Sequence, residues 1–339
     1  HRTENPCVPG SIPGGTTKGA LIFNLWGLAF FYEEQMYVLA MMKRLMNRLL
    51  LLAVAWLCLT GCADRANAPL ARSGNGVYYW RTVFALDSVE QAFLGKHGIN
   101  TLYCRYFDVV MDGSLPVPNA TIRFSRPVPE GQEVVPTVFI MNDCMQRGVN
   151  IDSLAVLIVR RVCQMNETHD IAHVRELQID CDYTLRNREL YYSFLQTVRR
   201  EARHRGMDLS VTVRLHQLSM PPPPADYGVL MLYNTGSIGQ YAGEATHNPI
   251  LDMRDVQPYL RHLKGYALPM GAAYPVFLWQ RDVHGVLIDH VADYDEILRT
   301  KRAVEQQRDD LRQFVLTYHL DHDNIDRYTP KQYEAIYEH

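Results

Sequence analysis

The feature that most constrains the fold is an alternation of short apolar segments with longer helical segments along residues 76–339. The short segments are rich in β-branched and aromatic residues, and this alternation is typical of βα units around a parallel sheet. The predicted strands are 77–84, 99–108, 134–141, 176–182, 208–216, 228–233, 273–280 and 314–320. Apolar residues at helical spacing predict helices at 86–97, 151–164, 188–205, 253–263 and 294–311. Eight strands in this order predict an α/β fold of the (β/α)8 TIM-barrel type.

Two segments depart from a regular barrel. Residues 111–132 are rich in proline without helical periodicity, and they predict an extended excursion in place of the second helix. The run Pro221–Pro224 replaces a long fifth helix, because proline cannot supply the hydrogen-bond donors of a helix interior. A doubly wound open sheet is the alternative fold, but the first strand is followed by no glycine-rich phosphate-binding loop.

The N-terminal part of the chain has a different character from the barrel. Basic residues between 43 and 48 precede an uncharged apolar run at 49–61, which is shorter than the roughly 20 residues that a membrane-spanning helix needs. This pattern predicts a signal peptide over residues 41–61. We expect residues 1–40 to be a non-native upstream extension and residues 62–75 to be a tether.

The apolar run ends Leu59-Thr60-Gly61-Cys62, which resembles the bacterial lipobox. The resemblance implies that Cys62 carries acyl chains, palmitate among them, and becomes the N-terminus of a lipid-anchored protein of the bacterial cell envelope. The outer membrane or the periplasmic face is the expected location. The alternative is a buried apolar helix with an incidental cysteine.

Charge and cysteine content exclude several partners. The chain has 34 Lys and Arg against 37 Asp and Glu, so no basic surplus can neutralise a nucleic-acid backbone, and no nucleic-acid partner is expected. No CxxC pair or cysteine near a histidine suggests a metal site, so we expect no metal and no cofactor. We expect a monomer. The cysteines at 104, 144, 163 and 181 are expected to be free thiols because the core is large enough without disulfides, which are the alternative.

Two carboxylates mark the end of the fourth predicted strand. Asp180 and Asp182 are two residues apart, so their side chains leave the same face, while Ile179 and Cys181 face the helices. Active sites of such barrels lie where the strands end, which makes both aspartates candidate catalytic residues. Because neighbouring carboxylates repel, one of them should have a raised pKa unless a cation or donors intervene. The alternative is a helix cap or a structural pair with arginine.

Other polar residues are predicted at the same barrel end. Arg214 and His216 are two apart on the fifth predicted strand and place a cation beside the two aspartates, as a binding or a structural ion pair. Candidate second acids are Asp108, Asp143 and Asp321, and His319 lies near the last of them. Each of these is alternatively a loop cap or a solvated side chain.

Aromatic residues also concentrate at the predicted strand ends. Trp80, Tyr233 and Trp279 are candidate saccharide-binding residues, together with Asn234, because aromatic rings stack on the apolar faces of sugars. The alternative is that these rings fill the core. No GxSxG motif points to a serine nucleophile.

The segment QIDCDYT at 178–184, the following helix and the strand LSVTVRL resemble an uncharacterised group of bacterial lipoproteins predicted to be TIM barrels. More remotely, residues 179–184 are similar to the DxxDxDxE signature of family 18, chitinase-like glycoside hydrolases, and residues 231–234 to their MxY[DN] motif. The first Asp of the signature falls on Leu177 and its Glu on Thr184, so both are absent.

The missing glutamate bears directly on function. In that family the glutamate protonates the leaving group and the preceding aspartate, here Asp182, orients the substrate acetamide. The hydroxyl of Thr184 cannot act as that acid. The resemblance therefore implies a glycoside hydrolase-like barrel that acts on or binds a saccharide. The alternative is a non-catalytic glycan-binding or structural envelope lipoprotein.

Overall fold

The computed structural model describes residues 42, 46, 72–236, 247–283 and 286–339. By its internal contacts the chain divides between residues 68 and 69, and the barrel belongs to the second unit. The predicted upstream extension, the signal peptide apart from Met42 and Met46, Cys62 and most of the tether lie outside the described residues. Within the described part of the chain, no helix combines the length and apolar character needed to cross a membrane.

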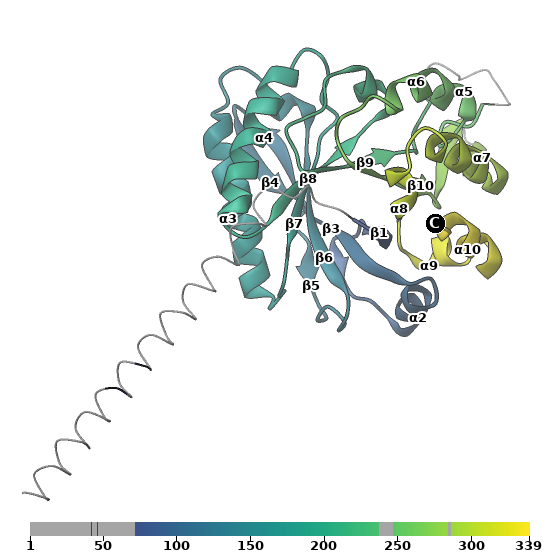
Figure 1. Cartoon of the computed structure of the whole chain (residues 1–339), viewed down its shortest axis with the longest axis horizontal. Coiled ribbons are helices and arrows are strands. Elements are labelled where there is room, and N and C mark those ends of the chain that lie inside the picture. Colours follow the sequence, from purple (N-terminus) through teal and green to yellow (C-terminus); the bar gives the residue numbers. More distant parts are fainter. Residues whose placement is uncertain (1–41, 43–45, 47–71, 237–246, 284–285) are drawn as a thin grey trace, which may run out of the picture. The chain divides into compact units, whose positions relative to one another are not determined.

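Eight parallel strands form a closed barrel (Figure 1). In spatial order they are β1 (Gly74–Tyr79), β13 (Phe314–Tyr318), β10 (Met270–Pro275), β9 (Tyr227–Met231), β8 (Asp208–Val213), β7 (Glu176–Asp180), β6 (Glu133–Ile140) and β3 (Ile99–Asp112). The first strand pairs with both the last and the second barrel strand, so the sheet has no break. The predicted (β/α)8 barrel is confirmed, and the open doubly wound sheet is excluded.

Helices surround the barrel, and those that the sequence predicts occur in the expected order, although the helix predicted at 294–311 ends at Glu305. The longer ones are α2 (Ser88–Lys96), α3 (Ile151–Thr168), α4 (Arg188–Arg203), α7 (Tyr294–Glu305) and α10 (Pro330–Tyr337). The predicted helix 253–263 is divided into α5 (Met253–Val256), the 3₁₀ helix η3 (Gln257–Tyr259) and α6 (Leu260–Leu263). Pro258 lies at this break, where its missing N–H and its ring interrupt helical hydrogen bonding. Two short helices complete the C-terminal part, α8 (Asp310–Gln313) and α9 (His322–Ile325).

The two irregular segments lack long helices, as predicted. Strand β3 continues through a turn into the antiparallel β4 (Leu115–Asn119), and β5 (Arg123–Phe124) pairs with β2 (Val83–Phe84). Both prolines of β4 lie on the edge of the sheet, where a missing N–H costs least. After β8 the chain forms only the 3₁₀ helix η2 (Leu215–Ser219) before the proline run.

Seven of the eight predicted strands end earlier than expected. The fourth ends at Asp180, so Asp182 lies beyond the strand. Three end earlier by three residues or more. The first was predicted to reach Phe84, but β1 ends at Tyr79. The fifth was predicted to reach His216, which instead lies in η2. The seventh was predicted over 273–280, but β10 ends at Pro275 and Trp279 belongs to a separate antiparallel hairpin of β11 (Leu278–Val283) and β12 (Val286–Val291). Proline cannot donate to a strand ladder, so the barrel strand ends there.

Polar side chains occupy part of the barrel interior. The side chains of Glu176 and Gln178 on β7 are fully buried and accept hydrogen bonds from Tyr103 and Tyr78 across the barrel. These bonds compensate the cost of burying polar atoms. The cysteines at 104, 144, 163 and 181 are free thiols, as the sequence predicted.

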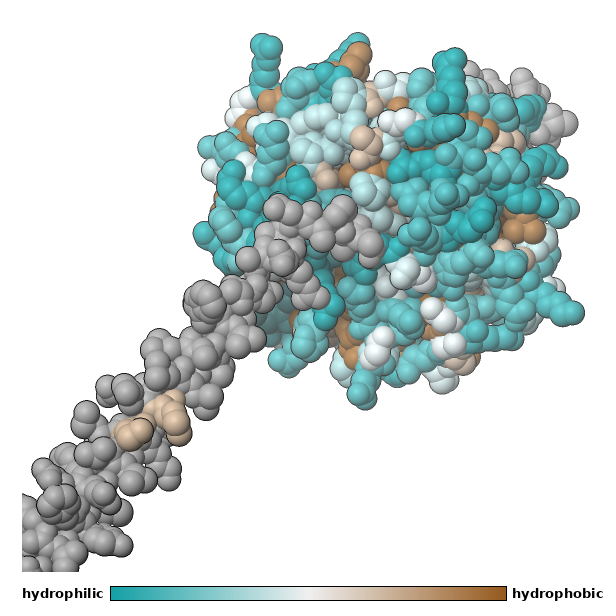
Figure 2. Space-filling view, in the orientation of Figure 1, coloured by the Kyte–Doolittle hydropathy of each residue, from teal (hydrophilic) through white to brown (hydrophobic). Residues whose placement is uncertain are grey.

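The face of the molecule in Figure 2 is mainly hydrophilic, and apolar residues are scattered over it. Large apolar side chains that are well exposed on the barrel unit are Val89, Leu115, Met141, Leu157, Leu185 and Val291. Single exposed apolar residues are ordinary on protein surfaces and indicate no binding site by themselves.

Candidate functional site

Asp180 and Asp182 lie where β7 ends, at the end of the barrel formed by the carboxyl ends of the strands, called the mouth below. Asp180 is buried at 3% exposure, and its Oδ1 accepts a hydrogen bond of 2.6 Å from Thr212 Oγ1 on β8. The Asp182 side chain is 50% exposed. The predicted carboxylate pair therefore consists of one buried and one accessible member.

Arg214 joins the two carboxylates, as the sequence predicted. It follows β8 directly, and its Nε donates to Asp182 Oδ1 at 2.5 Å, while its terminal nitrogen lies 3.8 Å from Asp180 Oδ1. The guanidinium carbon lies 5.7 Å from the centre of the Tyr233 ring. One cation thus holds the accessible carboxylate and shields the buried one, with an aromatic ring beneath it.

Burial and neighbouring charges shift the pKa values of Asp180 and Arg214 in different ways. Burial raises the pKa of Asp180, the charge of Arg214 opposes this, and the charge of Asp182 adds to it. For Arg214, burial by itself lowers the pKa, but the charges of Asp180 and of Asp182 raise it overall. Arg214 is therefore a permanent cation, whereas Asp180 retains a proton more readily than an ordinary aspartate.

A cavity of about 320 Å³ opens beside this cluster. It is lined by Asp182, Arg214, Leu215, His216, Met231, Tyr233, Asn234, Thr235 and Tyr259. Five of the predicted site residues line it, namely Asp182, Arg214, His216, Tyr233 and Asn234. His216 reaches it from η2 rather than from the strand, and its Nε2 lies 3.4 Å from the carbonyl oxygen of Tyr183.

Two other predicted residues, Trp80 and Asp108, form a separate cluster with Arg105. The carboxylate of Asp108 is paired with the guanidinium of Arg105, with 2.7 Å between Asp108 Oδ1 and Arg105 Nε. The guanidinium carbon lies 5.4 Å from the centre of the Trp80 ring, which packs on Tyr318 at 5.6 Å between ring centres. Tyr318 also stacks on Tyr233, which lines the cavity. The ring of Tyr318 therefore connects this cluster to the cavity.

The remaining candidates lie away from the cavity. Trp279 stacks on His290 within the β11–β12 hairpin, with 5.5 Å between ring centres. Asp143 is exposed in the 3₁₀ helix η1 (Asn142–Cys144). Asp321 caps α9 and lies 3.0 Å from His319 Nε2, so it serves as a loop cap.

Thr184, the position of the missing glutamate, is exposed and does not line the cavity. Its backbone N–H and its hydroxyl both lie within hydrogen-bond distance of Asn187 Oδ1, at 2.8 and 3.2 Å. Thr184 thus stabilises the turn that leads into α4.

Sequence reasoning missed five residues of the site, among them Leu215 and Met231, which line the cavity. Thr212 is two positions before Arg214, so strand periodicity would have placed its hydroxyl on the inner face of β8. Thr235 and Tyr259 line the cavity from the chain beyond β9 and from η3, and nothing in their local sequence signals this.

One group of side chains within the described residues has the spacing of metal ligands, namely Asp87, Glu90 and His322. Both oxygens of Glu90 are already engaged, one by Arg81 and the other by the backbone N–H of Asp87. Asp87 in turn caps α2 and contacts His322. We assign this group to helix capping and ion pairing.

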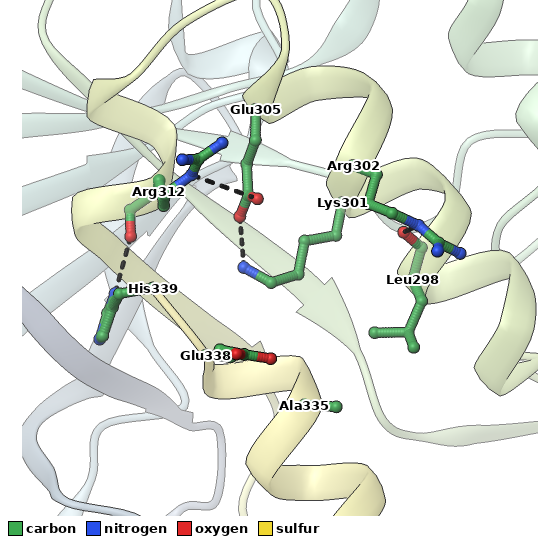
Figure 3. A pocket seen from close by; sticks show the side chains of 8 residues that line it. All are labelled: Leu298, Lys301, Arg302, Glu305, Arg312, Ala335, Glu338 and His339. Carbon is green, nitrogen blue, oxygen red and sulfur yellow. Dashed lines mark hydrogen bonds and ion pairs between the residues drawn. The ribbon is translucent and has the colours of Figure 1, made fainter.

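A second cavity, of about 290 Å³, is lined by residues of α7, α8 and α10 and by the C-terminal residues (Figure 3). Lys301 pairs with Glu305, whose Oε2 lies 3.7 Å from Arg312 Nε. His339 Nδ1 lies 2.7 Å from the Arg312 carbonyl oxygen, and Arg302 Nε donates to the Leu298 carbonyl. The contacts of Arg312 join α8 to α7 and to the C-terminal residue, and the other two contacts lie within α7.

Two solved structures with a similar fold can be compared with this chain. The spore cortex-lytic enzyme SleL of Bacillus megaterium QM B1551 has a TM-score of 0.51 at 11% identity, over 79% of this chain and 74% of SleL. A chitinase from Bacteroides thetaiotaomicron has a TM-score of 0.51 at 11% identity, over 79% of this chain and 97% of the chitinase. The predicted likeness to chitinase-like barrels is therefore confirmed at the level of the fold. No protein-family model and no curated protein sequence matches the chain.

Proposed function

We propose that this barrel is a saccharide-binding protein whose ligand occupies the cavity beside Asp182 and Arg214. The cavity lining combines the side chains of Tyr233 and Tyr259 with a half-exposed carboxylate, a guanidinium and the amide of Asn234. Aromatic side chains with a few convergent polar groups are typical of sugar-binding sites. Chitinase-like barrels with the same fold support the choice of ligand class.

The observation that carries this proposal is that, among the described residues lining the cavity, Asp182 is the single carboxylate, and it is paired with Arg214. In the chitinase-like family the aspartate orients the substrate acetamide, so hydrolysis needs a second acidic group near Asp182 that protonates the leaving group. Thr184 is bonded to Asn187, and Asp143 and Asp321 lie elsewhere. Binding without turnover is therefore the function that the site supports best.

Hydrolysis is the second candidate, and one observation favours it. The pKa of Asp180 is raised by burial, which is a property of general acids. Asp180 is nevertheless only 3% exposed and accepts a hydrogen bond from Thr212.

A glycan panel scored for both binding and product release tests the proposal. We expect the wild type to bind a subset of glycans and to release no product, and Asp182→Asn to lose binding. Glu189→Gln is the matched control, because its carboxylate belongs to an exposed ion pair with Arg188 on α4. Product release by the wild type would establish hydrolysis instead, and the absence of any binding would refute the saccharide proposal.

We further propose that the protein is anchored to the bacterial cell envelope through lipid on Cys62. The basic residues at 43–48, the apolar run and the Leu-Thr-Gly-Cys ending support this. The two or more acyl chains of such an anchor hold a protein at a membrane, whereas one chain is marginal. We expect Cys62→Ser to lose the acyl mass and to leave the membrane fraction. An unacylated wild type would contradict the anchor without bearing on saccharide binding.

A further inference from the structure

One wall of the cavity is held by a segment that is distant from it in the sequence. Asn234 and Thr235 line the cavity just after β9, and the stretch from His247 to α5 lies against them. The backbone N–H of Thr235 donates to the Ile250 carbonyl at 3.3 Å, and that of Gly236 donates to the Pro249 carbonyl at 3.2 Å. The position of the wall therefore depends on the 247–252 segment.

A buried histidine and an aspartate join the two segments through their side chains. The His247 side chain is 2% exposed, and its Nε2 lies 2.9 Å from Asp255 Oδ2. The same carboxylate oxygen accepts a hydrogen bond of 3.3 Å from Thr235 Oγ1. On the other side of the ring, Nδ1 lies 3.6 Å from Asp252 Oδ2. One oxygen atom thus contacts both the histidine and a residue of the cavity wall.

Gly236 shows how closely these parts are packed. A Cβ at this position would lie 2.8 Å from His247 Nε2, 3.0 Å from Asp255 Oδ2 and 3.1 Å from the Pro249 Cα. These are shorter than ordinary carbon contacts, so a methyl group would push the wall away from the histidine and the aspartate. Glycine is therefore needed at position 236, because the backbone there approaches His247, Asp255 and Pro249 too closely for a side chain.

We propose that His247 and Asp255 are positioning residues of the saccharide site, which hold Asn234 and Thr235 at the distance that the ligand needs. This inference rests on the proposed saccharide function. A small displacement of a polar group that contacts the ligand is costly, because hydrogen bonds to the ligand are lost while the groups remain desolvated.

A pair of glycine variants tests the geometry. We expect Gly236→Ala to weaken glycan binding by at least about tenfold, because the added methyl group displaces the wall. Gly265→Ala is the control, since a Cβ at Gly265 meets open space, and we expect unchanged affinity. Equal affinity in Gly236→Ala and Gly265→Ala, with both proteins folded, would overturn the positioning role.

Variants of His247 distinguish a role in positioning the cavity wall from a general contribution to stability. We expect His247→Ala to weaken binding and His247→Gln to recover part of the affinity, because the glutamine amide can still donate to Asp255. His204→Ala, at an exposed position after α4, is the control. Loss of affinity in proportion to a falling melting temperature, without recovery in His247→Gln, would instead indicate a structural role only.

Amide hydrogen exchange in the free protein makes the test independent of the ligand. We expect the amides of Thr235 and Gly236 to exchange faster in His247→Ala than in the wild type. Unchanged exchange would refute the positioning role even if no glycan is bound. If the wild type binds no glycan but exchange rises, His247 still positions this wall and the saccharide proposal alone fails. Faster exchange with unchanged glycan affinity would show that the wall does not contact the ligand, and would also refute the role.

Discussion

Both ends of the barrel contain an arginine between two carboxylates. At the amino ends of the strands, Arg72 donates from Nε to Glu176 Oε2 at 2.6 Å and from its terminal nitrogens to Glu133 at 2.7 and 3.1 Å. The second oxygen of Glu176 accepts a hydrogen bond from Tyr103. At the mouth, Arg214 has a short contact to Asp182 and a longer one to Asp180.

The two clusters differ in how much water reaches them. The Glu176 side chain is fully buried, that of Arg72 is 10% exposed and that of Glu133 is 31% exposed, whereas Asp182 is 50% exposed at the mouth. Because the nitrogens of Arg72 already donate to both carboxylates, this cluster stabilises the fold. A cluster that leaves a carboxylate half exposed beside a cavity retains the capacity to bind. Accessibility, and not residue type, therefore distinguishes the structural ion pair from the candidate site.

The largest effect on the free energy of unfolding is expected from removing Arg72. Arg72→Ala leaves Glu176 buried without a cation, which should lower the free energy of unfolding by about 3–5 kcal/mol in urea denaturation. The glycan affinity of the folded protein should not change. Arg188→Ala removes an exposed partner of Glu189 and should cost at most about 1 kcal/mol. Equal losses in the two variants would contradict the distinction drawn between buried and exposed pairs.

Removing Arg214 at the mouth should affect glycan binding more than stability. Arg214→Ala should abolish glycan binding, yet lower the free energy of unfolding by only roughly 1–2 kcal/mol. The cost is smaller because Asp182 returns to water and Asp180 can take up a proton. Calorimetric titration with a bound glycan and urea denaturation measure the two effects. A stability loss as large as that of Arg72→Ala would place Arg214 among the structural residues.

The raised pKa of Asp180 should make the stability of the wild type depend on pH. Burial raises the pKa of Asp180 above its ordinary value of 3.8, so the folded state binds its proton more tightly than the unfolded state. Its contribution to stability is thus fully present below the unfolded pKa and is lost as the pH rises through the folded pKa. We expect Asp180→Asn to remove this decline, measured as the free energy of unfolding from about pH 4 to pH 8. Parallel curves for wild type and variant would show that the pKa is not raised.

The smallest effect is expected at the position of the missing acid. Thr184 is exposed and bonded to Asn187, so Thr184→Glu should change stability by no more than about 0.5 kcal/mol and leave glycan affinity unaltered. Because Thr184 does not line the cavity, we expect no product release. Release of a β-linked N-acetylated sugar product would show that position 184 reaches the ligand and that loss of the acid separates this barrel from hydrolases.

Much of the fold could be predicted because it depends on local patterns. The eight strands are short apolar runs between helical segments, and each was recognised in the right order. Their ends were less predictable, since Pro275 ends β10 where the apolar pattern continues to Trp279. The predicted neighbourhood of Arg214 with Asp180 and Asp182 is confirmed by its contacts to both, although β7 ends at Asp180 and Arg214 follows β8.

Tertiary structure decided which charged residues form the candidate binding site and which form structural ion pairs. Arg72 lies in the segment predicted as a tether, yet it pairs with Glu133 and Glu176 across the barrel. His247 and Asp255 meet Thr235 only because the chain returns beside β9. The accessibility of Asp182 and the burial of Asp180, two residues apart, likewise depend on what packs over each of them. Periodicity determines which way a side chain points along its own strand, but contacts and water access depend on segments distant in the sequence, which no local pattern encodes.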